Sequence, residues 1–473
     1  MTEQRPVRIG TEVLTTPEGR EVRSPYDDHL IATVPSCTPA HVEQAIAAAV
    51  VAFADPMPAH QRADILDKAA LAVEAHVEEL ARIIAEEAAK PIRTARTEAE
   101  RSVITFRSAA VEARSLVGEI VPMDAATPGE GKLGFTLRVP RGVVAAISPF
   151  NFPLNLVAHK LAPAIAAGCP VVLKPASQTP LSAIRLHEIL MDECGLPAGW
   201  INVVTGSGGS VGDPLVLHDD VAMVTFTGSP DVGWAIAAKA ARKKVGLELG
   251  NNAPVIIDES GDWEAAVAKI AVAGFSHAGQ SCISTQRVYV HSSLIGAFRD
   301  ALTEKVAALK VGDPLDEATD VSSLISPDET KRVAGWIDEA TAAGAKVLVG
   351  GTQHDRLLDP TVLDGITPDM EVSSNEVFGP LVGLASFDSL DDALALANDT
   401  KYGLQAAIFT KELDGALRAA YELDFGGVLV NEVPTFRTDQ MPYGGVRDSG
   451  NTKEGPHYAV REMTRERLVV IQR

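Results

Sequence analysis

A single cysteine, Cys282, lies in a run of small and polar residues that could present its thiol for chemistry. The run reads Ala278-Gly279-Gln280-Ser281-Cys282-Ile283-Ser284, and the β-branched and aromatic stretch at 286–290 that follows is typical of a buried strand. A thiol on a turn at a strand edge can attack a carbonyl carbon if its neighbours keep it ionised or deprotonate it. The alternative is that Cys282 is a small buried hydrophobic residue, which is the usual role of a lone cysteine.

A carboxylate and an amide elsewhere in the chain could assist such a thiol. Glu248 lies between Leu247 and Leu249, an apolar setting that would raise the pKa of its carboxyl group and suit it to act as a general base. Its alternative is a strand-end glutamate in a salt bridge. Asn151 follows an apolar run at 143–147, where its amide could donate a hydrogen bond to a developing oxyanion. Its alternative is a turn-forming asparagine.

Two glycine-rich runs follow strand-like segments and could approach a phosphate group. One extends from Gly228 to Gly233 and opens a helix near Trp234, and the other extends from Gly206 to Gly212. Glycines allow close approach of the backbone, and a helix N-terminus favours an anion. Neither run matches the usual dinucleotide pattern, so each could also be a simple turn.

The composition excludes several classes of protein. The chain has 473 residues, of which 46% are hydrophobic, and this is enough for two or more cores. Its net charge of −21 and the lack of a basic stripe argue against nucleic acid as a partner. The four cysteines are scattered without metal-ligand spacing, so we expect no disulfide, no metal and a cytoplasmic protein. No run is typical of a membrane span, and we expect no membrane partner.

The N-terminal part is predicted to be a helical scaffold after two short strands near 20–22 and 30–34. Thr38 and Pro39 open a helix whose buried face is predicted from Val42, Ile46, Val50 and Phe53, at helical spacing. A longer helix is expected from about 59 to 90, ended by Pro91, and another continues to about 116.

From residue 142 onward, strands alternate with helices. Strands are predicted at 143–147, 170–174, 201–204 and 222–226, with helices between them, and this order is typical of a doubly wound nucleotide-binding unit. A second α/β unit has strand candidates at 255–257, 288–290, 346–349, 382–387, 406–409 and 428–430. Residues 132–139 and 465–471 predict exposed strands that form an arm and need a partner edge, which a neighbouring subunit can supply.

Taken together, the motifs resemble the NAD(P)-dependent aldehyde dehydrogenase superfamily over roughly residues 10–470. The resemblance is carried, in the family's order, by the runs Ser148 to Leu154, Lys174 to Pro180, Phe226 to Ser229, Leu247 to Gly250, Gly279 to Cys282, Asn375 to Pro380 and Pro442 to Gly445. It implies an α/β fold with three parts. These are a doubly wound cofactor-binding domain (1–118 and 140–250), a second α/β catalytic domain (251–453), and a small β oligomerisation arm (119–139 and 454–473) of a homodimer or homotetramer.

The resemblance implies a role for each catalytic candidate. Cys282 would attack the aldehyde carbon, and Asn151 with the backbone amide of Cys282 would form the oxyanion hole. Hydride transfer would leave a thioester, and Glu248 would activate the water that hydrolyses it. Lys160 and Glu454 match positions that resemble the family's proton-relay pair.

The resemblance also implies NAD or NADP as the cofactor. The positions expected to contact it are Ile147, Ser148, Phe150, Lys174, Ser177, Gly208, Gly212, Gly228, Ser229, Gly233, Leu249, Gly250, Glu376 and Phe378. Many strictly NAD-dependent members carry glutamate where this chain has Ser177. Because serine neither grips the ribose diol nor repels a 2′-phosphate, the sequence favours use of NADP or of both cofactors.

The expected substrate is a small polar or anionic aldehyde, such as a semialdehyde, a hydroxyaldehyde like lactaldehyde, or a phospho- or sulfo-aldehyde. Candidate substrate residues are Phe152, His159, Ser281, Ile283, Arg437 and Tyr443. Arg437 could bind an anion, or it could form an ion pair at the surface or at a subunit interface. A CoA-acylating dehydrogenase and a catalytically silent protein are the alternative functions. The presence of Glu248 disfavours the first, and intact Cys282, Glu248 and Asn151 disfavour the second.

Overall fold

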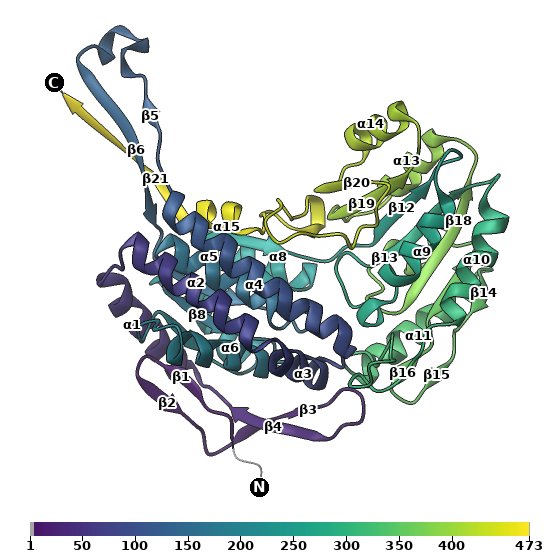
Figure 1. Ribbon diagram of the computed structural model, residues 1–473, viewed down its shortest axis with the longest axis horizontal. Helices are drawn as coiled ribbons and strands as arrows, with labels where there is room; N and C mark the ends of the chain where they lie inside the picture. The colour runs from purple at the N-terminus through teal and green to yellow at the C-terminus, as the bar shows by residue number, and fades with distance from the viewer. Residues whose placement is uncertain (1–3, 473) are drawn as a thin grey trace.

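The computed structural model describes residues 4–472 and consists of two α/β units beside each other, with a thin β arm projecting from the first (Figure 1). The prediction of an α/β fold with two such units and an arm is confirmed. None of the helices that the structure describes has the length and apolar character that a bilayer span requires.

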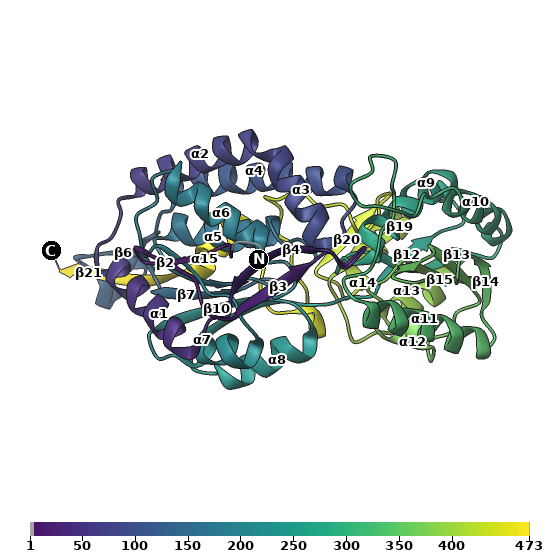
Figure 2. The same ribbon diagram turned by 90° about the horizontal axis from the view of Figure 1, so that it is seen from below.

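The first unit contains a five-stranded parallel sheet in the order β11-β10-β7-β8-β9. Its strands are β7 (Val143–Ile147), β8 (Val171–Lys174), β9 (Ile201–Val203), β10 (Val221–Thr227) and β11 (Lys244–Glu248). Each residue of β7 is buried, as expected for a strand covered on both faces. Helices α4 (Ile92–Ser115), α5 (Asn155–Ala167) and α6 (Leu181–Asp192) lie on one side, and α7 (Asp213–Leu217) and α8 (Pro230–Lys239) lie on the other (Figure 2).

The helical scaffold differs from the sequence prediction in two respects. The helix expected over 59–90 is two helices, α2 (Ala59–Ala75) and α3 (Val77–Ala88), because the chain breaks at His76. In α1 (Pro39–Ala54), Val42 and Ile46 are buried, but Val50 and Phe53 are 38% and 37% exposed. Alanines at 45, 49 and 52 form the rest of the buried face, because the helix packs close to its neighbours where the side chains are small.

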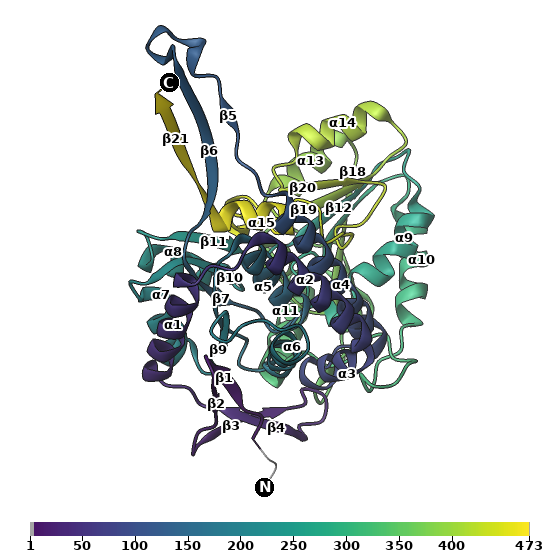
Figure 3. The ribbon, with the colours of Figure 1, turned by 60° about the vertical axis from the view of Figure 1, so that its left-hand side comes forward.

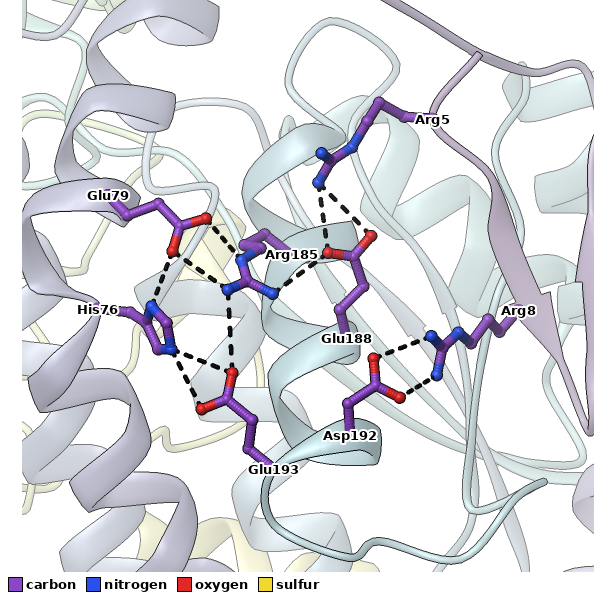
Figure 4. Close-up of polar contacts among 8 residues, drawn as sticks. All are labelled: Arg5, Arg8, His76, Glu79, Arg185, Glu188, Asp192 and Glu193. Carbon is purple, nitrogen blue, oxygen red and sulfur yellow. Dashed lines mark hydrogen bonds and ion pairs between the residues drawn. The ribbon is translucent and has the colours of Figure 1, made fainter. Parts of the chain in front are cut away.

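The N-terminal strands are fastened to the first unit by ion pairs. They are β1 (Val7–Ile9), β2 (Glu12–Leu14), β3 (Gly19–Arg23) and β4 (Leu30–Pro35). Arg5 pairs with Glu188 at 3.3 Å, and Arg8 with Asp192 at 2.6 Å, both on α6 (Figure 4). Arg185 of the same helix bonds Glu79, so this charged surface ties three segments of the chain together.

The second unit is a seven-stranded sheet in the order β14-β17-β18-β13-β12-β19-β20. The strands are β12 (Ala253–Ile257), β13 (Thr285–His291), β14 (Lys346–Val349), β17 (Thr361–Asp364), β18 (Leu381–Phe387), β19 (Gln405–Phe409) and β20 (Gly427–Val430). All neighbours are parallel except β14 and β17. The sheet is covered by α9 (Trp263–Ala273), α10 (Ile295–Ala307), α11 (Pro327–Ala342), α12 (Glu371–Ser374), α13 (Leu390–Asn398) and α14 (Leu413–Glu422). The short β15 (Gln353–His354) and β16 (Leu357–Leu358) form a separate hairpin.

The arm is a three-stranded antiparallel sheet that stands away from both units (Figure 3). It consists of β5 (Ile120–Val121), β6 (Lys132–Pro140) and β21 (Thr464–Gln472), and β6 and β21 pair along their whole length. The range 454–473, expected to be arm strand, also contains helix α15 (Pro456–Met463), which packs on α5 of the first unit. The arm is therefore anchored by a helix just before its last strand.

Candidate active site

Cys282 lies on a strained turn directly before β13. Three consecutive residues, His277, Ala278 and Gly279, have φ values of 50°, 53° and 70°. This left-handed conformation is unfavourable for residues with a Cβ atom. At Gly279 a side chain is also excluded by contact, because a Cβ atom there would lie 2.0 Å from the carbonyl oxygen of Gly379. The turn thus packs closely against the loop at 375–380, and this contact fixes the position of Cys282.

Asn151 lies on a loop whose backbone is hydrogen-bonded to a buried ion pair, Lys90 and Glu98. Lys90 donates from Nζ to Glu98 at 2.5 Å and to the carbonyl oxygen of Asn151 at 2.6 Å. Glu98 also accepts hydrogen bonds from the backbone amides of Leu154 and Asn155. The side chains of Lys90 and Glu98 are fully buried. The loop after β7 is therefore bonded on both sides, which a functional loop requires.

The loop of Asn151 meets the turn of Cys282 through one hydrogen bond. Nδ2 of Asn151 donates to the carbonyl oxygen of Gln280 at 2.8 Å. An amide nitrogen carries two donors, so the second N–H of Asn151 remains for a ligand beside Cys282. This geometry is compatible with the oxyanion-stabilising role predicted for Asn151.

The sulfur of Cys282 is half-buried and lies against Tyr443. Sγ is 2.8 Å from the Tyr443 hydroxyl, and Ile283 and Leu404 pack around both. Burial raises the pKa of the Cys282 thiol to about 12, although the Tyr443 hydroxyl opposes this shift by hydrogen bonding. At neutral pH the thiol is protonated, so it needs a base before it can act as a nucleophile.

Glu248 has the burial, the lack of hydrogen-bond partners and the raised pKa that suit a general base. Its side chain is buried, and neither carboxylate oxygen has a hydrogen-bond partner among the described residues. Burial and then the charge of Glu454 raise the pKa of Glu248 well above its usual value. The predicted salt-bridge alternative for Glu248 is thus absent from the contacts described between residues 4 and 472, and the carboxylate is free to bind a water or a proton.

A second cluster of charged side chains lies beside this site. Arg437 donates to Oε2 of Glu454 at 2.9 Å, and its guanidinium lies 3.9 Å from the centre of the Tyr443 ring. His159 contacts Arg437 at 3.1 Å and Asp439 at 3.0 Å through Nε2. The ion pair expected as an alternative for Arg437 is therefore present, but it is buried and lies next to the tyrosine that touches Cys282.

Lys160 and Glu454, expected as a proton-relay pair, are each bonded to other residues. Lys160 donates to Thr225 and Thr227 of β10, and Glu454 is paired with Arg437. Burial lowers the pKa of Lys160, and the charge of Glu454 opposes that shift, so the two groups interact only through their charges. Although burial alone would raise it, the pKa of Glu454 is lowered by the charges of Arg437, His159 and Lys160.

The carboxyl edge of the first sheet carries a cavity of about 380 Å³ that fits a nucleotide. Four predicted cofactor residues line it: Ile147, Lys174, Gly208 and Gly212. At Gly208 an added Cβ atom would meet no atom within 4 Å, so the cavity is open along this backbone. Phe226, Val232, Ile236 and Lys239, which were not among the predicted cofactor contacts, also line the cavity, and their apolar atoms suit an adenine ring.

The other cofactor candidates do not line this cavity. Ser229 is the N-cap of α8, and no side-chain bond occupies its hydroxyl there. Glu376 accepts from the backbone amide of Asn251 at 2.9 Å, and burial raises its pKa to about 7. A Cβ atom on Gly250 would lie 2.3 Å from Glu376, so the glycine is needed for this approach.

The two aromatic candidates contact each other. The rings of Phe150 and Phe378 meet edge to face at 5.8 Å. Among the remaining candidates, Leu249 and Ser148 are buried, Gly228 donates to the carbonyl oxygen of Glu248, and a Cβ atom on Gly233 would collide with Leu249.

Several residues that shape the site were not singled out by the sequence. They are Lys90 and Glu98, which bond the backbone of the Asn151 loop, and Asp439, Arg101, Thr105 and Asn155 around His159. Glu98 alone carried a signal, because it falls at helical spacing among the buried alanines 95 and 99 of α4. Of the substrate candidates, Phe152 faces Lys90, with Nζ 3.7 Å from its ring centre, and Ser281 and Ile283 flank Cys282.

Comparison with known proteins identifies the family. The sequence pattern of the aldehyde dehydrogenase family matches residues 14–469. A 3-sulfolactaldehyde dehydrogenase of Priestia aryabhattai is 46% identical over 98% of this chain and 97% of its own length. The crystal structure of aldehyde dehydrogenase 21 from Physcomitrella patens, in complex with the reaction product succinate, is 37% identical with a TM-score of 0.97, and the match covers 100% of this chain and 99% of that one.

A third relative was solved with a bound nucleotide. The glyceraldehyde-3-phosphate dehydrogenase GapN from Methanocaldococcus jannaschii, complexed with NADP, is 38% identical with a TM-score of 0.93, covering 97% of this chain and 100% of that one. The chain therefore belongs to the aldehyde dehydrogenase family, as its motifs predicted, and is an NAD(P)-dependent oxidoreductase that acts on aldehydes.

The contact between Tyr443 and Cys282 leads to a testable prediction about pH. A hydroxyl that donates to the thiolate lowers the pKa of the thiol, so Tyr443→Phe should raise that pKa further. At a fixed pH below the pKa, each unit of increase reduces the thiolate fraction about tenfold. The measurement is the rate at which iodoacetamide alkylates Cys282 at pH 8, with the modified protein detected by mass spectrometry. We expect this rate to be several-fold lower in Tyr443→Phe. An unchanged rate would show that the hydroxyl does not stabilise the thiolate, and Cys282→Ser supplies the blank.

Proposed function

We propose that the protein oxidises a small polar or anionic aldehyde to its carboxylic acid by a hydrolytic, covalent mechanism. The observation that carries the proposal is that the turn of Cys282 is hydrogen-bonded to Asn151, and that the buried Glu248, without a hydrogen-bond partner in the described chain, is near enough for its charge to act on the Cys282 thiol. In this mechanism the Cys282 thiolate attacks the aldehyde carbon, while Asn151 and the backbone amide of Cys282 stabilise the oxyanion. When bound, the nicotinamide cofactor accepts the hydride from the carbon.

The second half of the proposed reaction is hydrolysis of the thioester on Cys282. Glu248 removes a proton from the attacking water, because its raised pKa makes it a stronger base than an exposed carboxylate. Lys160 and Glu454 are the groups proposed to relay this proton onward, and their charges shift the pKa of Glu248 in opposite directions, Glu454 raising it and Lys160 lowering it. A CoA-acylating enzyme needs no such base, so the buried, unpartnered Glu248 supports hydrolysis.

The proposed substrate class rests on the cluster around Arg437. Arg437 is a buried cation whose Nε has no hydrogen-bond partner in the described chain, and it lies on the ring of Tyr443 beside the thiol. A guanidinium can bind a carboxylate, phosphate or sulfonate through two parallel hydrogen bonds. Names of related proteins agree with this class, since one acts on sulfolactaldehyde and another was solved with succinate.

We also propose that the predicted domain ranges act as cofactor-binding, catalytic and oligomerisation parts. The five-stranded sheet lies within the first range, the seven-stranded sheet within the second, and the arm strands within the third. The arm exposes Leu137 and Ile471 on one face and Leu468 and Val470 on the other, and a second subunit would cover these apolar side chains in a homodimer or homotetramer.

Removing the nucleophile tests the covalent mechanism. In Cys282→Ala, we expect NAD(P)H formation with every aldehyde of a panel to fall to the background level, while nucleotide binding and thermal stability stay close to those of the wild type. The panel is measured with and without CoA, which distinguishes hydrolysis from acyl transfer to CoA. Turnover above background in Cys282→Ala would rule out the covalent route.

A variant of the proposed base tests the division into two steps. Glu248→Gln keeps the shape of the side chain but cannot accept a proton, so thioester hydrolysis should slow by about a hundredfold or more. Because hydride transfer precedes this step, stopped-flow absorbance should still show a burst of NAD(P)H of about one equivalent per site. Loss of the burst together with the steady state would assign Glu248 to an earlier step instead, such as activation of Cys282.

A variant of the buried cation tests the substrate class. Arg437→Met should lower kcat/KM for anionic aldehydes by about tenfold to a hundredfold, because one or two charge-assisted hydrogen bonds are lost. Neutral aldehydes of equal size should lose much less. Since the single variant leaves Glu454 buried without its partner, the double variant Arg437→Met with Glu454→Gln is the control for stability. An equal loss for both aldehyde classes would make Arg437 a structural residue.

A further inference from the structure

The chain between Tyr443 and Glu454 is a loop whose two ends are bonded to each other. Tyr443 and Glu454 exchange backbone hydrogen bonds of 3.3 and 2.5 Å in an antiparallel bridge. Lys453, at the second end of the loop, donates from Nζ to the carbonyl oxygen of Gly444, at the first end, at 2.5 Å. Within residues 4–472 this is the single hydrogen bond of the Lys453 side chain, and its ammonium forms no ion pair there. Lys453 therefore closes the loop without being neutralised by a carboxylate.

Glu248, the last residue of β11, lies against this loop through both its backbone and its side chain. Its backbone forms an antiparallel bridge with Gly450. A Cβ atom added to Gly444 would lie 2.7 Å from Oε1 of Glu248 and 3.0 Å from Cδ of Lys453. The carboxylate of Glu248 and the side chain of Lys453 thus flank the same point of the loop, where a glycine leaves room for both.

Four charged groups act on the carboxylate of Glu248. Burial and then the charge of Glu454 raise its pKa, whereas the charges of Arg437, Lys160 and Lys453 lower it. Arg437 is bonded to Glu454 and Lys160 to two threonine hydroxyls, and both of these side chains are buried. Lys453 is half-buried, and the charge of Glu248 opposes the lowering of its pKa by burial. Lys453 is therefore a cation whose charge is balanced chiefly by Glu248.

Two further titratable groups face Glu248, the thiol of Cys282 and the hydroxyl of Tyr443. Burial raises the pKa of the thiol to about 12 and that of the hydroxyl well above its usual value. Both groups are therefore neutral near pH 7, and Cys282 carries no charge once it has become a thioester. The ionisation of Glu248 before hydrolysis thus depends on its burial and on the four charged groups.

We propose that Lys453 is a positioning residue for Glu248, which keeps the carboxylate ionised and holds the loop of Gly444 against it during thioester hydrolysis. The inference rests on the proposed role of Glu248 as the base of that step. In the step, an O–H bond of water breaks and its proton goes to Glu248. The water oxygen bonds the thioester carbon, and the C–S bond breaks with its electron pair returning to the sulfur of Cys282. Only an ionised carboxylate can take this proton, and burial together with Glu454 opposes ionisation.

Infrared absorption of the protonated carboxyl group, with Glu248→Gln as the reference, measures the ionisation of Glu248 without aldehyde or cofactor. Lys453→Gln keeps a hydrogen-bond donor for Gly444 but removes the charge, so the titration midpoint should move to higher pH by about half a unit or more. Lys453→Arg should titrate close to the wild type, because the charge is retained. The matched control is Lys244→Gln, which removes a partly exposed lysine from the strand of Glu248 where it is paired with Glu462, and it should leave the midpoint unchanged.

Stopped-flow kinetics provides a second measurement. After the burst of NAD(P)H, the steady-state rate of Lys453→Gln should be several-fold lower than that of the wild type at pH 7. It should approach the wild-type rate as the pH rises, because Glu248 then ionises without the cation. The burst itself should be unchanged, since hydride transfer comes before hydrolysis.

Two results would overturn the proposal. They are an infrared midpoint that does not move in Lys453→Gln, and a loss of rate by the same factor at every pH, which would make Lys453 a structural residue only. Failure of the proposed role of Glu248 would appear elsewhere, as loss of the burst in Glu248→Gln with Lys453 intact. The infrared midpoints would still show in that case whether Lys453 acts on the carboxylate.

Discussion

The buried ion pair of Lys90 and Glu98 is the constraint on which the geometry of the site depends. It joins the helical scaffold to the loop of Asn151 through the carbonyl oxygen of Asn151 and the backbone amides of Leu154 and Asn155. Removal of one partner from such a pair typically costs about 3–5 kcal/mol, since it leaves an uncompensated buried charge. The two groups are eight residues apart, across Pro91, so the break between α3 and α4 brings them together. What holds the Asn151 loop in place is therefore a contact between the helical scaffold and that loop, and not the loop itself.

A chain of hydrogen bonds connects the Asn151 loop to the second unit. Asn151 bonds the carbonyl oxygen of Gln280, and Gln280 in turn accepts from the backbone amide of Ile325 at 2.9 Å. These bonds, together with the contact with Gly379, offset the conformational strain of the left-handed turn at 277–279. The same backbone that positions the thiol also lies against the loop of Glu376 and Phe378. The loop of Asn151 and the turn of Cys282 are thus parts of one hydrogen-bonded frame that also reaches Ile325, which explains how the half-buried sulfur of Cys282 is held in place.

Much of this arrangement could be predicted from short stretches of sequence. Apolar runs such as 143–147 predicted the strands, and the local settings of Cys282 and Glu248 predicted a thiol on a turn and a buried carboxylate. Partners that come from distant segments could not be predicted in the same way. Arg437 was expected either at a substrate or in an exposed ion pair, and its buried bond to Glu454 depends on how two loops pack. Val50 and Phe53 have helical spacing, but neighbouring alanines face the core instead, because helical spacing does not determine which stripe is buried.

The pairing of Arg437 with Glu454 also has a consequence for proton stoichiometry. Glu454 keeps its pKa low through the nearby cations, and chiefly through Arg437. An anionic ligand bound by Arg437, as proposed above, would deprive Glu454 of this partner, and the burial of Glu454 would then favour its protonated form. Glu454 would take up a proton from solution as the ligand binds. Under that proposal the apparent affinity for the ligand declines as the solution becomes more alkaline.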